Sequence, residues 1–499
     1  MIRHKDNFST RIRVENYELS YSILEISAID FLITLFIMQH DDLIKRFEEL
    51  LANNTRSFFD SDEFDILIDY YLTANQYHKA LKAVDFALEQ YPYSIDFLIR
   101  KAQLLSANKE TRKALELLVQ AEGIDPIHPE VFMTRGSIYS LIGLPEKAIE
   151  NFKLSIEHSG ENKELIEDAY LYLAFEYENL EQYEDAIFCL KKTININPKN
   201  NPALYELSFC FEVSGKDNEA VEYFDKFLDA HSYSHCAWFN LGVVYNRMGL
   251  FEKAVEAYDY VIAIKEDFAP AYFNKANSLA NINKLKEAIV CYEETFKYEK
   301  PEAITYCYIG ECYEKLKNFE QSLLNYNRAT SLDPSLGDAW IGMGIVLDQQ
   351  DKLTEGIHYL KKAIDIDKTN ADYWYVIGDA YQKLGFTEEA KDAYKKVIEI
   401  DPTLENIWLD YSNLLYEEGD KEEAVEVLAL GIKNHPDNAE LFYRMAALLL
   451  WSGKKQEALT YLQSALQLDY KKHKEIFKFI PELRKNRTVL DMIKSYRKR

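Results

Sequence analysis

Small residues return along the chain at one fixed phase, and large apolar residues surround each of them at helical spacing. The interval between them is 34 residues, except for one of 38 residues between Ala148 and Ala186. The twelve positions are Ala80, Ala114, Ala148, Ala186, Ala220, Ala254, Ala288, Ser322, Gly356, Ala390, Ala424 and Ala458. A period of this length predicts a solenoid in which each unit packs on its neighbours.

Each period contains the pattern of two amphipathic helices. We number the units from residues 61, 95, 129, 167, 201, 235, 269, 303, 337, 371, 405 and 439. In the unit that begins at residue 235, positions 4, 7, 8 and 11 share one helical face and hold Trp238, Leu241, Gly242 and Tyr245. Small residues at positions 8 and 20 let two antiparallel helices approach closely. The pattern therefore predicts an all-α fold.

Prolines and one insertion mark where the units end. Position 32 is proline in six units, where it stops the second helix. These prolines are Pro92, Pro126, Pro198, Pro334, Pro402 and Pro436. The four additional residues of the 38-residue interval fall at 160–166, where we expect a longer helix or loop.

The motif W-x-x-L-G-x-x-Y, followed by A-x-x-x-F/Y and then P, resembles the tetratricopeptide repeat. Two units carry it most completely. One has Trp238, Leu241, Gly242, Tyr245, Ala254 and Tyr258, and the other has Trp374, Gly378, Tyr381, Ala390, Tyr394 and Pro402. The resemblance covers 61–472 and implies a right-handed α-solenoid of about twelve helix-turn-helix units of 34 residues.

The two ends of the chain lie outside this array. Residues 1–37 include the apolar run FLITLFIM, and we interpret them as a start-site extension or a disordered segment, with Met38 as an alternative start to Met1. Residues 38–60 predict a helix that covers the first unit, and residues 473–499 predict basic helices that cover the last unit. The apolar run is too short to span a bilayer, so we do not expect a membrane protein.

Charge and motif content exclude several classes of function. The net charge is −25, which disfavours nucleic acid as a partner of the solenoid. Residues 471–499 carry eleven Lys or Arg against three acidic residues, and we interpret them as a solvated terminal helix. Six scattered cysteines without a C-x-x-C pair predict reduced thiols and a cytoplasmic protein. No catalytic, cofactor-binding or metal-binding motif is found, so the sequence predicts neither an enzyme nor a cofactor.

The resemblance implies that the first helices line a concave groove, with positions 2, 5, 6, 9, 12 and 13 available to a ligand. We expect a peptide-binding groove in the middle units, because aromatic and asparagine side chains recur there at these positions or beside them. The candidate residues are Phe175, Tyr205, Phe209, Phe239, Asn240, Asn246, Phe273, Asn274, Asn277 and Asn281. Asparagine amides can pair with the backbone of an extended peptide whatever its sequence. The same side chains could instead serve packing between units, and that alternative stays open.

The sequence thus predicts a non-enzymatic scaffold or adaptor that binds a neutral or basic protein segment. Glu212, Glu311, Glu314 and Asp379 make the groove acidic, which argues against an adaptor for the acidic tail of a chaperone. Three alternatives remain: a module that recruits substrate for an enzyme encoded elsewhere, self-association through the solenoid ends, and membrane attachment through residues 22–38. The sequence does not determine the oligomeric state.

Overall fold

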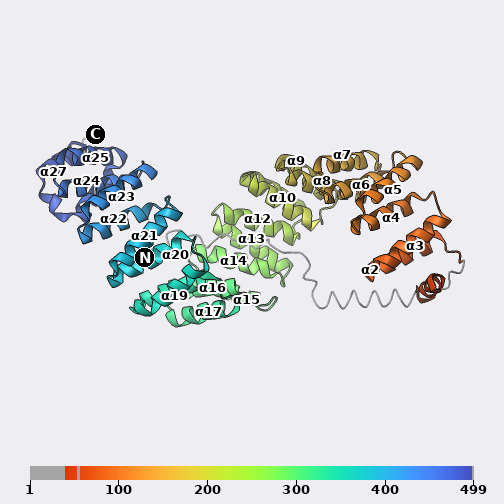
Figure 1. Ribbon diagram of the computed structural model, residues 1–499, viewed down its shortest axis with the longest axis horizontal. Coiled ribbons are helices and arrows are strands. Elements are labelled where there is room, and N and C mark those ends of the chain that lie inside the picture. The colour runs from red at the N-terminus through yellow and green to blue at the C-terminus, as the bar shows by residue number, and fades with distance from the viewer. Residues whose placement is uncertain (1–39, 53–56, 497–499) are drawn as a thin grey trace. The chain divides into compact units, whose positions relative to one another are not determined.

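The computed structural model describes residues 40–52 and 57–496 (Figure 1). These residues fall into two compact units, an amino-terminal unit that ends at Ser278 and a carboxy-terminal unit that begins at Leu279. All regular structure in the described part of the chain is helical, without a strand. In each unit the helices follow one another as antiparallel pairs. The predicted all-α solenoid is therefore confirmed.

The amino-terminal unit contains a helix at residues 40–52 and the helices up to α14. They are α2 (Ser61–Thr73), α3 (Tyr77–Gln90), α4 (Ile95–Ala107), α5 (Thr111–Ile124), α6 (Pro129–Leu141), α7 (Pro145–His158), α8 (Lys163–Asn179), α9 (Tyr183–Ile196), α10 (Asn201–Val213), α11 (Asp217–Ala230), α12 (His235–Arg247), α13 (Phe251–Ile264) and α14 (Ala269–Asn281). The last three residues of α14 lie past the boundary between the units.

The carboxy-terminal unit continues the same alternation. Its helices are α15 (Leu285–Thr295), α16 (Ala303–Lys315), α17 (Phe319–Leu332), α18 (Gly337–Gln349), α19 (Leu353–Ile366), α20 (Ala371–Leu384), α21 (Thr387–Ile400), α22 (Glu405–Glu418), α23 (Lys421–Asn434), α24 (Ala439–Trp451) and α25 (Lys455–Leu468). Two short α-helices, α26 (Glu475–Phe479) and α27 (Arg487–Tyr496), follow with the 3₁₀ helices η1 (Tyr470–Lys474) and η2 (Pro481–Lys485).

The insertion lengthens a helix rather than a loop. α8 is 17 residues long and begins at Lys163, four residues before the predicted unit start at residue 167. The side chain of Asn162 caps it by accepting a hydrogen bond from the Leu165 amide. The additional residues therefore add about one turn to the amino end of α8.

Close contact between the two helices of a unit explains the two rows of small residues. A Cβ atom on Gly242, at position 8, would lie 2.6 Å from the Tyr258 ring at position 24. At position 20, a Cβ atom on Gly356 would lie 3.0 Å from the carbonyl oxygen of Gly344. A larger residue at either position would force the helices apart. Glycine at these two positions is thus required by the helix crossing.

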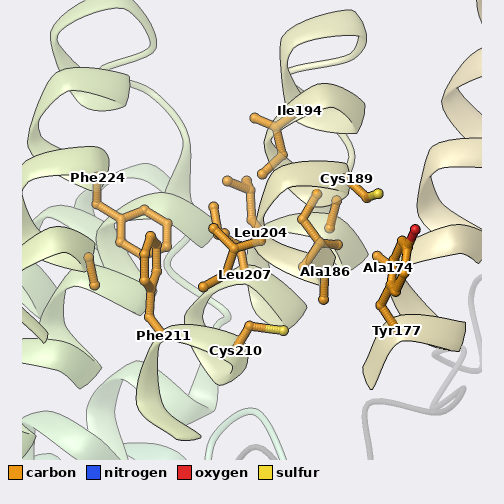
Figure 2. Packing of buried hydrophobic residues seen from close by; sticks show 14 of the residues in the cluster. Ala174, Tyr177, Ala186, Cys189, Ile194, Leu204, Leu207, Cys210, Phe211 and Phe224 are labelled. Carbon is orange, nitrogen blue, oxygen red and sulfur yellow. The ribbon is translucent and has the colours of Figure 1, made fainter. Parts of the chain in front are cut away.

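Around these crossings the side chains form continuous cores. Figure 2 shows the core of α8 to α11, which includes Ala174, Ala186, Leu204, Leu207 and Phe211. All five side chains are fully or almost fully buried. The Cys210 sulfur is directed away from the Phe211 ring, toward the side of α8 that carries Ala174 and Tyr177 (Figure 2).

In four units, tryptophan at position 4 ties the first helix to the turn before it. The indole N–H of Trp238 donates a 2.9 Å hydrogen bond to the Ser232 carbonyl, six residues earlier. Trp340, Trp374 and Trp408 make the same bond at 2.9 to 3.3 Å. Tryptophan therefore fixes the angle at which the chain enters the next helix pair.

Apolar faces of terminal helices cover both ends of the described helices. The helix at residues 40–52 buries Leu43, Ile44, Phe47 and Leu50 among side chains of α2 and α3. At the other end, side chains of the terminal helices pack against α24 and α25. The buried ones are Ile476, Ile480, Leu483, Val489 and Ile493. Residues 1–37 fall outside the described part of the chain.

Candidate functional site

The structure places nine of the ten candidate side chains in the amino-terminal unit. They lie on the first helices α8, α10, α12 and α14. The tenth, Asn281, is the last residue of α14 and lies past the boundary. We therefore describe the site from the nine residues of the amino-terminal unit.

The aromatic candidates differ strongly in exposure. Phe209 is 45% exposed, whereas Phe175 and Tyr205 are partly buried. Phe239 is 1% exposed and its ring contacts Phe268 with centroids 5.2 Å apart, so that it belongs to the core beside α13. Phe273 is 2% exposed. Phe209, at position 9, thus offers the largest exposed aromatic surface of the five.

Four of the five asparagine candidates are buried, and two of these have side-chain atoms without a hydrogen-bond partner among the described residues. Asn240 donates a 3.2 Å hydrogen bond from Nδ2 to the Leu204 carbonyl. Asn274 is 1% exposed, and neither its Nδ2 nor its Oδ1 has a partner in the part of the chain that the structure describes. Asn246 is 4% exposed, and its Oδ1 is also without a partner. Asn277 is buried and Asn281 partly buried. A buried polar group without a partner is uncommon and calls for an explanation.

Two carboxylates that the sequence analysis missed lie on the same set of first helices. Glu178 is at position 12 on α8 and Glu206 at position 6 on α10, and both are partly buried. The Cys210 thiol donates to Glu178 Oε1 over 3.3 Å. Burial raises the pKa of Glu178 to about 7, and the nearby charge of Glu206 contributes to that rise. Burial also raises the pKa of Glu206.

Neither carboxylate has a positively charged partner within the described residues. The groups that affect the pKa of Glu178 are Glu206 and Cys210, and burial alone raises that of Glu206. Burial and both carboxylates also raise the pKa of the Cys210 thiol, which therefore stays neutral. Two like charges without a cation in a partly buried site destabilise one another.

Elsewhere in the repeats, a side chain at position 13 of the next unit pairs with the carboxylate at position 12. Arg247 contacts Glu212 at 2.8 Å, and Lys383 contacts Asp348 at 2.7 Å. Gln349 donates to Glu314 in the equivalent place over 3.3 Å.

For Glu178, the residue at position 13 of the next repeat is Val213. It is 46% exposed and cannot pair with a carboxylate. Its place at position 13 explains why Glu178 lacks the partner that other units supply. Reading positions 12 and 13 of successive units side by side would have revealed this gap from the sequence.

Other chemistry is sparse. The described residues contain no group of three or more His, Cys, Asp or Glu side chains that could hold a metal ion. The six cysteines are free, and five of them are buried. None of the described helices is long and apolar enough to cross a membrane. What distinguishes the site is therefore its hydrogen-bonding and charge, rather than a reactive group.

Three solved structures illustrate the similarity of this chain to known folds. The APC/C heterotetramer Cut9–Hcn1 matches with a TM-score of 0.39 and 15% identity, over 88% of this chain and 99% of that chain. MamA matches with a TM-score of 0.30 and 22% identity, over 32% of this chain and 94% of that chain. YrrB, described as a tetratricopeptide repeat protein with an unusual peptide-binding site, matches with a TM-score of 0.30 and 22% identity. The match to YrrB covers 36% of this chain and 94% of that chain. None of the curated proteins matches the sequence.

Family models identify the repeat. Models described as tetratricopeptide repeat match six stretches of the chain. These are residues 167–200, 214–269, 269–300, 303–336, 337–370 and 383–442. Tetratricopeptide repeats are typically non-catalytic modules for interaction between proteins. The repeat motif, the paired helices and these matches together show that the chain belongs to the tetratricopeptide repeat family.

Proposed function

We propose that this protein is a non-enzymatic scaffold or adaptor whose first helices bind an extended segment of a partner protein. The observation that carries the proposal is Asn274, whose amide is buried and has neither of its hydrogen-bonding atoms paired. Leaving such a group unpaired costs about 1–3 kcal/mol. A bound backbone that displaces the side chains covering Asn274 and supplies a donor and an acceptor would recover this cost.

Two other candidate side chains also support peptide binding. Asn246 Oδ1 lacks a partner, and Phe209 is exposed at a position where it could cover a ligand side chain. An amide provides one acceptor and two donors, which match the N–H and C=O groups of an extended peptide. Binding through the peptide backbone would tolerate many partner sequences.

The charge of the groove favours a neutral or basic segment. Glu178 and Glu206 place carboxyl groups in the groove of a chain whose net charge is −25. Like charges across an interface oppose association. We also propose the cytoplasm as the place where the protein works, since its cysteines are free and mostly buried.

The test is affinity capture from native cells with the full chain. We compare the wild type with Asn240→Ala/Asn274→Ala and identify bound proteins by mass spectrometry. The matched control is Asn151→Ala on α7, a buried asparagine whose amide donates 2.8 Å to the Lys147 carbonyl of its own helix. We expect the double variant to lose a partner that the wild type and the control both retain.

Circular dichroism shows whether each variant keeps its helices. If the double variant unfolds, the loss of partners says nothing about the groove, and Asn274→Ala alone is used, because that amide holds no part of the fold together. If a folded variant captures the same partners as the wild type, the proposed groove is wrong, and binding must use another surface.

A further inference from the structure

We infer that the groove recognises a lysine or arginine side chain of the partner segment through Glu178 and Glu206. This inference rests on the proposed function and names the chemistry of the bound segment. It combines three features of the amino-terminal unit: two carboxylates to which no described residue supplies a cation, a missing side-chain partner at position 13, and buried asparagine atoms at positions 12 and 6 that are unpaired.

The repeat itself shows what Glu178 lacks. Glu212 occupies the same position one unit later and is held by Arg247, whose guanidinium lies 2.8 Å from it. The residue in the place of Arg247 for Glu178 is Val213, which is 46% exposed. A partner lysine or arginine that enters over Val213 would provide the missing charge.

Glu206 makes this position more favourable for a cation than a single carboxylate would be. Its charge acts on Glu178 from the adjacent helix α10, and neither group is fully solvated. A cation that binds both would relieve their repulsion as well as gain two charge-assisted contacts. The neutral Cys210 thiol, which donates to Glu178, holds one carboxylate oxygen in position.

The backbone of the bound segment would continue from this point toward the two buried asparagines that have unpaired atoms. The interval from Glu178 to Glu206 is the same as that from Asn246 to Asn274. The two asparagines therefore occupy positions 12 and 6, two units further along, and their buried amides have three unpaired atoms. The carboxylate pair would select the side chain, and the amides would hold the main chain.

The exposed ring of Phe209 completes the environment of a long basic side chain. It lies between Glu206 and Cys210 on α10 and points its surface to solvent. The aliphatic part of lysine or arginine packs well on an aromatic ring while its charged end meets a carboxylate. Glutamate and aspartate in the partner would instead be repelled.

The experiment selects displayed peptides of random sequence on the immobilised full chain. The measured quantity is the frequency of lysine and arginine among bound peptides relative to the starting library. We expect enrichment on the wild type and no enrichment on Glu178→Gln/Glu206→Gln, which still binds peptides through its amides. An individual lysine peptide from the selection should bind the double glutamine variant about tenfold more weakly.

Glu212→Gln is the matched control, because that carboxylate is already paired with Arg247 inside the chain. It should retain the enrichment. Circular dichroism and thermal unfolding confirm that the glutamine variants are folded, and removal of two mutually repelling charges should not destabilise them. Equal loss in the control would overturn the assignment to Glu178 and Glu206.

The remaining outcomes separate this inference from the proposed function. If the wild type selects peptides that are not rich in lysine or arginine, and Asn240→Ala/Asn274→Ala abolishes the selection, the groove binds peptides but the carboxylates do not read a basic side chain. If the wild type selects no peptides at all, both proposals are wrong.

Discussion

Positions 12 and 13 of the repeat are used in two different ways in this protein. In the carboxy-terminal unit Asp348 is bound by Lys383 at 2.7 Å, and the same lysine also contacts Asp379. In the amino-terminal unit Glu212 is likewise bound by Arg247, but the residue at position 13 after Glu178 is Val213, and no described residue supplies Glu178 with a cation. A single residue at position 13 thus decides whether a carboxylate ties two repeats together or remains for a ligand.

Position 6 shows the same contrast. Asp410 in α22 accepts a hydrogen bond from the Tyr375 hydroxyl and lies near the charge of Arg444. Its counterpart Glu206 in α10 has neither kind of partner within the described residues. The difference teaches that a repeat can keep its packing while individual groove positions change from structural contacts to recognition contacts.

The largest predicted effect tests whether the two units share the same packing. Ala254→Leu in the amino-terminal unit and Ala390→Leu in the carboxy-terminal unit each place a larger side chain at a fully buried helix crossing. Each should lower the free energy of unfolding by about 1–3 kcal/mol, as measured by urea titration. A neutral result at one site would mean that the units differ in their cores and not only in their grooves.

The next prediction concerns a variant in which Glu178 gains an internal positively charged partner. Val213→Arg supplies Glu178 with the side chain that Arg247 gives to Glu212. We expect the affinity for a selected lysine peptide to fall about tenfold, because the internal guanidinium competes with the ligand. Fluorescence anisotropy with the labelled peptide measures the change, and Val213→Leu is the control of similar size without charge. An equal loss with leucine would point to steric blocking.

A third prediction compares two buried asparagines, one in each unit. Asn274→Leu removes an amide without partners, and should raise the free energy of unfolding by about 1 kcal/mol. Asn325→Leu removes an amide that donates 2.8 Å to the Gln321 carbonyl, and should lower it by about 1 kcal/mol. Thermal and urea unfolding provide the comparison. Destabilisation by both substitutions would indicate that Asn274 supports the fold.

The smallest predicted effect is the pH dependence of binding. The ionisable groups beside Glu178 are Glu206 and Cys210 of α10, and Cys210 stays neutral. As the pH rises through about 7, Glu178 loses its proton while a peptide lysine keeps its charge. The affinity should therefore increase a few-fold from about pH 6 to about pH 8, and Glu178→Gln should remove the dependence. Anisotropy at constant ionic strength is the measurement.

Stability should follow the opposite direction over this range. Because the folded state raises the pKa of Glu178 from 4.5 to about 7, it binds more protons than the unfolded state between these values. The free energy of unfolding should consequently fall as the pH rises through this window. A rise with pH that Glu178→Gln abolishes would contradict the assigned environment of this carboxyl.

The fold could be predicted from the sequence because each recurring residue type has one dominant structural cause. Glycine at position 8 of the unit that begins at residue 235 is required by the ring at position 24, as Gly242 and Tyr258 show. A proline two residues after a helix ends the periodic pattern, as Pro402 does after Ile400. These constraints act within a unit and are visible in one period of the sequence.

The site was harder to predict because its features arise from contacts between successive repeats. Whether Phe239 lies in a groove or a core depends on its contact with Phe268, which directly precedes α14 of the next repeat. The state of Glu178 depends on Val213, 35 positions later, as the pair Asp348 and Lys383 at the same separation shows. Whether an asparagine is unpaired, as for Asn274, requires the positions of all surrounding atoms.

The tryptophans that bond to the preceding turns provide intrinsic fluorescence reporters. Of the five tryptophans in the sequence, Trp238 alone precedes Ser278, and its ring stacks on Tyr260 with centroids 4.3 Å apart. It lies two residues from Asn240, on the helix next to the unpaired carboxylates. With the other four tryptophans replaced by phenylalanine, its emission would follow ligand entry and local opening of the amino-terminal unit in real time, without any attached dye.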